Sequence, residues 1–213
     1  MKKIWITILM VFVIIGLAVA PCGATSHGKA EGTDKKPMMD KKPMMAKKQE
    51  ALKPPVIKLE RVEIASYWGW IDPAKSSTPL VLAFVFALEN PNKTMVMLDD
   101  LKFTVAFEDF EVNTVMYYDD NYVPGGKTDY LRVNVVLDSA VANGMLLVSR
   151  GHTLIEMIER KEITKSHDLL EKWWKGVSDF TFPISVRNGT ATFEDPKGQV
   201  IRASFEGIFS PKK

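Results

Sequence analysis

The chain carries the stretch PLVLAFVFALENPN at residues 79–92, and this stretch decides the fold. From Leu80 to Leu88, large apolar side chains alternate with smaller apolar ones, which is the period of a β-strand. Because both sets are apolar, we expect a central strand that is covered on both faces. The residues Glu89-Asn90-Pro91-Asn92 then predict a turn.

Alternating patterns predict further strands on either side of this one. An opening strand, Ile57–Ile64, shifts its apolar register between Leu59 and Val62, which predicts a β-bulge. Asn188-Gly189 is typical of a two-residue hairpin turn, and Pro196-Lys197-Gly198 of another turn. Seven or so short strands separated by turn signals indicate a sandwich or a barrel. The later expected strands are Phe103–Phe107, Tyr130–Leu137, Phe180–Val186 and Val200–Phe209.

A helical stretch interrupts the later strands. Thr153-Leu154-Ile155-Glu156 has the form of a capping box and predicts the start of a short helix. A second helix is expected to begin at Ser166 or His167 and to end at Gly176. On it, Leu169, Leu170, Trp173 and Trp174 share one face. We expect the two tryptophans to close one end of the β core.

The N-terminus, residues 1–24, has the pattern of an export segment. Lys2 and Lys3 precede an apolar run over residues 4–20, which is typical of a signal peptide or a short membrane anchor. Three fates stay open: cleavage, retention as an anchor, and lipidation of Cys22, the single cysteine, in a lipobox-like context. All three predict an exported protein of the periplasm or cell envelope.

Residues 25–55 show no hydrophobic period and repeat a six-residue motif. The sequence KKPMMD at 35–40 is followed by KKPMMA at 41–46. Proline at this spacing disfavours helix and strand alike, so we expect an extended tether. Its lysines either lie against anionic lipid or keep the tether solvated. The remaining residues, 56–210, are long enough for one domain with its own core.

Composition and spacing argue against most kinds of chemistry. The formal net charge is only +2, which does not favour nucleic-acid binding. The three histidines have no zinc-ligand spacing, and the acidic pairs 99–100, 108–109 and 119–120 are typical of solvated loops. No catalytic residue, metal or cofactor is therefore predicted. The aromatic group Tyr67, Trp68 and Trp70 is either end packing or a contact surface.

The ordered set of motifs resembles the type-2 late embryogenesis abundant (LEA) family, also called LEA14-like or WHy domains. The long strand runs into Asn90-Pro91-Asn92, the turn Pro124-Gly125-Gly126 precedes the strand Tyr130–Leu137, and the ending passes from Phe182-Pro183 through Asn188-Gly189 to Phe205-Glu206-Gly207. The resemblance covers residues 56–209. It implies an all-β fold, an immunoglobulin- or fibronectin-III-like antiparallel β-sandwich, here with one or two short helices between the later strands.

For function, the resemblance implies a non-enzymatic role in desiccation and other stress. A first hypothesis is an exported protein that binds or stabilises client proteins or membranes. A second is a subunit of an envelope assembly that binds a lipid or protein partner and is tethered to the membrane. The oligomeric state stays open.

Overall fold

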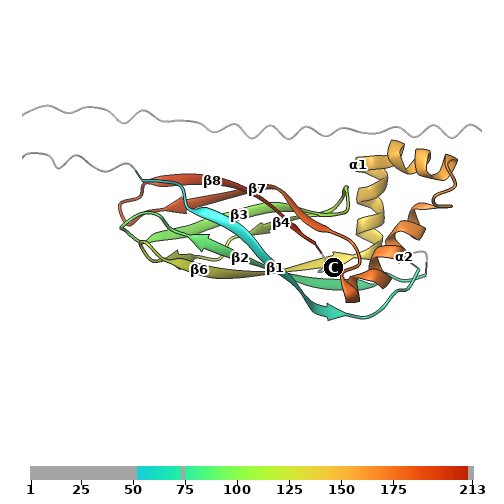
Figure 1. The fold of residues 1–213 in the computed structure, drawn as a ribbon, viewed down its shortest axis with the longest axis horizontal. Helices are drawn as coiled ribbons and strands as arrows, with labels where there is room; N and C mark the ends of the chain where they lie inside the picture. Colours follow the sequence, from blue (N-terminus) through green and yellow to red (C-terminus); the bar gives the residue numbers. More distant parts are fainter. Residues whose placement is uncertain (1–51, 73–74, 211–213) are drawn as a thin grey trace, which may run out of the picture. The chain divides into compact units, whose positions relative to one another are not determined.

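The computed structural model describes residues 52–72 and 75–210. These residues form eight strands and two α-helices, with a 3₁₀ turn, η1, after the second helix (Figure 1). In chain order the elements are β1 (Val56–Tyr67), β2 (Pro79–Glu89), β3 (Val96–Phe107), β4 (Phe110–Tyr117), β5 (Asn121–Val123), β6 (Thr128–Asp138), α1 (Ser139–Glu159), α2 (Ser166–Gly176), η1 (Val177–Asp179), β7 (Ile184–Glu194) and β8 (Val200–Phe209).

The strands form two antiparallel sheets, which confirms the predicted all-β sandwich. One sheet has the order β1-β2-β6 and the other β4-β3-β7-β8, with β5 paired to β3. Between the sheets lies an aromatic core built from three strands. The ring centroids of Phe86 and Phe103 lie 5.2 Å apart, and those of Phe86 and Phe205 lie 5.4 Å apart. Both pairs are edge-to-face, an arrangement that aromatic rings favour.

Strand β2 is the central strand that its sequence predicts. Its large residues from Leu80 to Leu88 are buried against the other sheet. On its outer face Ala83 and Val85 are also buried, flanked by long polar side chains of β1 and β6. There the Arg132 guanidinium pairs with the Glu63 carboxylate at 3.3 Å across β2. Small side chains on β2 thus let its neighbours reach over it.

The predicted bulge in the first strand is confirmed. β1 shifts its register against β2 between Leu59 and Arg61, and again between Ile64 and Ser66. The two shifts change which side chains of β1 face the core, because side chains of a strand alternate between its faces. Val62 is therefore buried, although it is an odd number of residues from the buried Ile57.

The hairpin predicted at Asn188-Gly189 is wrong. β7 runs without a break from Ile184 to Glu194, and the two residues form a bulge opposite Phe205 of β8. Asn188 has a φ of 52°, in the left-handed region that asparagine tolerates. A Cβ on Gly189 would lie 2.4 Å from the Phe205 carbonyl oxygen, so only glycine fits. An Asn-Gly pair is typical of left-handed backbone both in a hairpin turn and in a bulge. Only the pairing of β7 with β8 shows that this pair forms a bulge.

The strand predicted from Phe180 begins later, at Ile184. Phe180 has a left-handed backbone with a φ of 49° and ends the 3₁₀ turn. Phe182 is buried but stands before the strand. The apolar alternation therefore continues outside the strand, because Phe182 is buried in the core without belonging to β7.

The first helix begins much earlier than the predicted start at Thr153. α1 starts at Ser139, and the Asp138 side chain accepts hydrogen bonds from the backbone N–H groups of Ala140 and Val141. Arg150 departs from helical backbone angles and kinks the helix, so the predicted segment is its second half. The second helix is confirmed at Ser166–Gly176. Both helices lie at one end of the sandwich, on the right of Figure 1, and this end is called the helical end below.

Candidate functional site

Asn90 and Asn92 organise the end of the sandwich opposite the helical end. Asn90 is 2% exposed, and its amide nitrogen donates to the carbonyl oxygens of Thr94 and Val123. Its amide oxygen accepts hydrogen bonds from the backbone and side-chain nitrogens of Asn92, each at 3.0 Å. All the hydrogen-bonding capacity of this buried amide is used, which is the condition for burying it.

Asn92 holds the chain where it enters the domain. Its side-chain oxygen accepts from the backbone N–H of Lys53, and its side-chain nitrogen donates to the Lys53 carbonyl, both at 2.8 Å. The neighbouring turn packs closely against this motif, because a Cβ on Gly125 would lie 2.3 Å from the Lys93 carbonyl oxygen. Pro91 is exposed. The Asn90-Pro91-Asn92 motif thus fixes the backbone of its own turn and holds Lys53 against it.

The structure separates the three aromatic residues that follow the first strand. Tyr67 is half-buried against the core. Trp70 is also half-buried, and its ring meets Trp174 edge-on at a centroid distance of 6.2 Å. Trp68 is 77% exposed, and its ring nitrogen donates to the Ser66 hydroxyl. Two of the three therefore pack the helical end, and Trp68 alone of the three is exposed.

The paired tryptophans of α2 close the core at the helical end, as the sequence predicts. Trp173 and Trp174 are fully buried, and each lies against the Phe107 ring at the end of β3. The Trp174 ring nitrogen donates to the Thr78 carbonyl at 3.2 Å. The Trp173 ring nitrogen donates to the Glu108 carboxylate at 3.3 Å. Each indole thus combines a buried ring with a satisfied N–H group.

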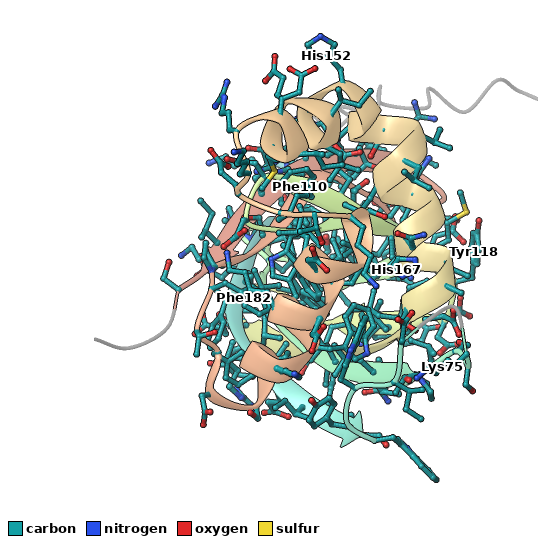
Figure 2. The ribbon with its side chains drawn as sticks, turned by 90° about the vertical axis from the view of Figure 1, so that its right-hand side faces the viewer. Lys75, Phe110, Tyr118, His152, His167 and Phe182 are labelled. Carbon is teal, nitrogen blue, oxygen red and sulfur yellow. The ribbon has the colours of Figure 1, made fainter. Side chains whose placement is uncertain are left out.

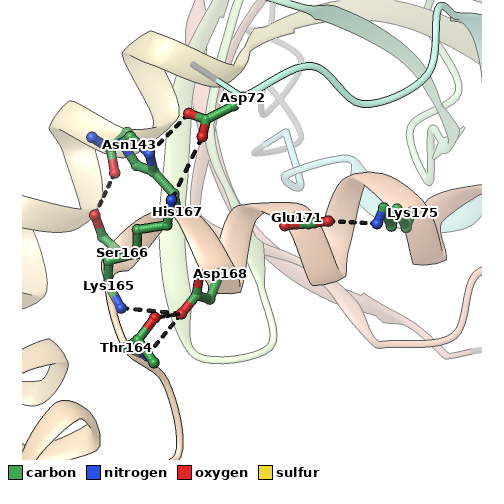
Figure 3. Close-up of polar contacts among 9 residues, drawn as sticks. All are labelled: Asp72, Asn143, Thr164, Lys165, Ser166, His167, Asp168, Glu171 and Lys175. Atoms are coloured by element: carbon green, nitrogen blue, oxygen red, sulfur yellow. Dashed lines mark hydrogen bonds and ion pairs between the residues drawn. The ribbon is translucent and has the colours of Figure 1, made fainter. Parts of the chain in front are cut away.

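A set of polar contacts ties α2 to the loop that follows the aromatic residues (Figure 3). The Asp72 carboxylate lies 3.1 Å from Nδ1 of His167 and 3.5 Å from Nζ of Lys165. The Ser166 hydroxyl donates to the Asn143 side chain and joins α2 to α1. These contacts hold the two helices and the loop together.

Asp168 caps the start of α2. We expect the stability that is lost in Asp168→Ala to depend on pH. Its carboxylate accepts hydrogen bonds from the hydroxyl and backbone N–H of Thr164 and from the N–H of Lys165. The hydrogen bonds from Thr164 hold the pKa of Asp168 below its usual value of 3.8. Asp168→Ala should lower the free energy of unfolding at pH 7 by about 1 kcal/mol, the usual cost of losing a cap.

The direction of this pH dependence follows from the lowered pKa of Asp168 in the folded state. The carboxylate contributes stability above the pKa of the unfolded chain, and this contribution is lost as pH falls through the folded pKa. Urea unfolding at pH 7 and at pH 3 should therefore show a smaller difference between wild type and Asp168→Ala at the lower pH. Asp99→Ala, at an exposed position, is the control. A difference independent of pH would contradict this assignment.

The outer face of α1 exposes apolar side chains that the sequence analysis did not single out. Val148 is 87% exposed, and Val141, Leu147 and Ile155 are each more than half exposed. The buried residues of α1 include Ala142, Leu146 and Leu154. Figure 2 looks onto the helical end, with His152 standing at the outer edge of α1. The spacing of these apolar residues could have indicated exposed positions on a helix, but only if the helix was known to begin at Ser139. We call these four exposed residues the α1 patch.

The other residues considered for chemistry are dispersed. Glu108 pairs with Lys172, and Asp109 with Arg187. His152 is exposed beside Glu156, far along the chain from His167. Among the residues that the structure describes, no three His, Cys, Asp or Glu side chains gather closely enough to hold a metal ion. Neither described helix is long and apolar enough to span a bilayer. The predicted export segment, residues 4–20, and Cys22 lie outside the described residues.

A pocket of about 220 Å³ lies on the outer face of the larger sheet, near the Asn90-Pro91-Asn92 turn. It is lined by Met95, Met97, Tyr122, Glu194, Asp195 and Pro196. A wider hollow of about 490 Å³ lies over the β7 bulge and is lined by Asn188, Gly189, Thr190, Ser204, Phe205 and Glu206. The first combines apolar walls with the carboxylates of Glu194 and Asp195, and the second mixes polar side chains with the Phe205 ring.

Comparisons with known proteins found matches among solved structures. No family model and no curated protein matches the chain. A crystal structure of a protein from Archaeoglobus fulgidus matches with 14% identity and a TM-score of 0.36, covering 73% of this chain and 99% of that one. A protein from Arabidopsis thaliana, solved in solution, matches with 12% identity and a TM-score of 0.45, covering 78% and 88%.

A third similar structure is a solution structure of a protein assigned provisionally to the late embryogenesis abundant (LEA) proteins. It shares 10% identity with this chain, has a TM-score of 0.38, and the match covers 74% of this chain and 72% of that one. In class, the chain is a two-sheet antiparallel β-sandwich with a helical end.

Proposed function

We propose that the protein is a non-enzymatic binding module that is exported, stays near the membrane through its N-terminal segment, and stabilises client proteins or membranes under water stress. The observation that carries the proposal is the α1 patch. Its four apolar side chains are each more than half exposed although they belong to one helix of a folded domain, and exposed apolar area is what a partner surface can bury. Trp68, which follows β1, is exposed at the same end of the sandwich.

The scaffold beneath the α1 patch supports this role. α1 packs its buried residues on the core, and the Ser166–Asn143 hydrogen bond joins it to α2, which the buried tryptophans anchor. The patch is therefore presented on an ordered surface, and little conformational entropy is lost when it binds. Uncharged apolar side chains bind any apolar surface without selecting a sequence. This property suits a protein that meets many partly unfolded clients.

A drying assay tests the proposal. A client enzyme is dried and rehydrated with the full-length protein, or with an equal mass of albumin, and its recovered activity is measured. We expect the protein to protect better than albumin. The variant Val141→Ser/Val148→Ser/Ile155→Ser should lose most of this protection while it keeps its melting temperature, since all three side chains are exposed.

The matched control is Tyr130→Ser/Val200→Ser, which removes exposed apolar side chains from strand ends away from the helices. This variant should protect as well as the wild type. Protection no better than that of albumin, or equal loss in both variants, would overturn the proposal.

A further inference from the structure

The pocket near the Asn90-Pro91-Asn92 turn is built by the strand register. In the larger sheet, Met97 of β3 lies opposite Tyr122 of β5 on one side and opposite Glu194 of β7 on the other. Val96 and Leu98 are fully buried, so Met97 points away from the core. Met95 precedes it by two residues and lines the same pocket. The row of side chains thus crosses three strands on the outer face.

The walls of the pocket differ in chemistry. Tyr122 and Met95 are 52% and 42% exposed, and with Met97 and Pro196 they form an apolar lining. The opposite wall is the turn between β7 and β8. There the Asp195 carboxylate is buried and accepts hydrogen bonds from the backbone N–H groups of Lys197 and Gln199, at 2.9 and 2.8 Å. This wall is fixed and negatively charged.

Glu194 supplies a second carboxylate to the pocket, and this carboxylate is unpaired among the described residues. Its side chain is half-buried, and it has no hydrogen-bond or ion-pair partner among residues 52–72 and 75–210. A carboxylate partly withdrawn from water and left unpaired costs free energy. A positive charge placed beside it restores the lost interaction, and more effectively here than at a fully exposed site.

We propose that this pocket binds a small organic cation, an ammonium group carried on an apolar body. The Glu194 carboxylate faces the charge, and the tyrosine ring offers its negative π face to it. The two thioethers are polarizable and adapt to the apolar part of the ligand. The volume of about 220 Å³ is below the roughly 300–1,000 Å³ typical of sites for drug-sized ligands, so the ligand is smaller than those. This site goes beyond the proposed function and uses the other end of the sandwich.

The test compares two probes of the same shape with different charge. Choline carries a trimethylammonium group, and 3,3-dimethyl-1-butanol replaces it with a neutral tert-butyl group. Each is titrated into the full-length protein carrying ¹³C-labelled methionine methyl groups, and the shifts of the Met95 and Met97 signals are followed. We expect saturable shifts with choline, and binding of the neutral probe at least about tenfold weaker, a difference near 1.4 kcal/mol.

Two variants separate the contributions of the Glu194 charge and the Tyr122 ring to choline binding. Glu194→Gln keeps the shape of the wall and should weaken choline binding at least about fivefold, while it leaves the neutral probe unchanged. Tyr122→Leu keeps an apolar wall and should also weaken choline binding. Glu206→Gln, on the same outer face but in β8 and away from the pocket, is the control and should bind choline like the wild type.

The choline titrations can support or overturn the proposed cation site. Selective binding of choline that Glu194→Gln weakens supports the proposal. Equal binding of the two probes, absence of saturable binding of choline, or equal affinity in Glu194→Gln and wild type would overturn it. The α1 patch variant should still bind choline, so failure of the protective role and failure of this site are distinguishable.

Discussion

Replacement of Trp174 by alanine should lower the free energy of unfolding by about 3–5 kcal/mol, the range for truncating a buried aromatic residue. The indole is fully buried at the helical end. It contacts the rings of Trp70 and Phe107, and it donates a hydrogen bond to the Thr78 carbonyl. Alanine leaves a cavity between the two sheets and α2, and it leaves the carbonyl without this donor. Urea unfolding at pH 7 measures the loss.

Two further tryptophan variants sharpen this prediction. Trp174→Phe keeps a ring but removes the N–H donor, so we expect a smaller loss, near the roughly 1–3 kcal/mol of an unsatisfied buried acceptor. Trp68→Ala is the matched control, because that side chain is 77% exposed, and it should change stability by less than about 0.5 kcal/mol. Equal losses for Trp174→Ala and Trp68→Ala would contradict the assignment of Trp174 to the core.

Replacement of Asn90 by alanine should cost about 3–5 kcal/mol at the opposite end of the sandwich, because several buried groups lose a partner together. The Thr94 and Val123 carbonyls lose a donor, and the Asn92 backbone N–H loses its acceptor. The alanine side chain has no polar atoms, so it can neither donate to these carbonyls nor accept from Asn92 as the Asn90 amide does. Urea unfolding again measures the loss.

The same variant should loosen the chain at Lys53. Asn90 orients the side chain of Asn92, which bonds both the N–H and the carbonyl of Lys53. The Lys53 amide should therefore exchange with solvent faster in Asn90→Ala than in the wild type. Asn134→Ala, an exposed asparagine on β6, is the control and should change neither stability nor exchange. Unchanged exchange at Lys53 in Asn90→Ala would contradict this coupling between the two asparagines.

Local patterns predicted the elements where one physical requirement dominates. β2 could be recognised as a central strand because both of its faces are apolar, and α2 because its four buried residues recur at helical spacing. The β1 bulge followed from a break in the apolar register. In each case the residues that decide the structure are neighbours in the sequence.

Local patterns failed where two structures share one signal. Asn188-Gly189 permits the left-handed backbone of a hairpin turn and of a bulge, and the pairing of β7 with Phe205 on β8 selects the bulge. The start of α1 was missed because Gly144 and Gly151 weaken the helical pattern there, whereas packing against the sandwich sustains the helix. The capping residue, Asp138, was the local signal that marks the start of α1.

The candidate sites divide in the same way. The sequence identified Asn90, Asn92 and the aromatic group, but which of the aromatic rings is exposed depended on where Trp174 lies. The α1 patch required the true start of α1, and the pocket at Glu194 required the register that brings β5, β3 and β7 together.

The sequence by itself therefore determined the all-β class, the central strand, the tryptophan-bearing helix and the turn motif, because each is encoded by the spacing of nearby residues. The tertiary structure alone decided the bulge at Gly189, the length of α1, the exposure of Trp68 and the row of Tyr122, Met97 and Glu194. The physical reason is that these features depend on contacts between segments far apart in the chain, whose free energies outweigh local backbone preferences.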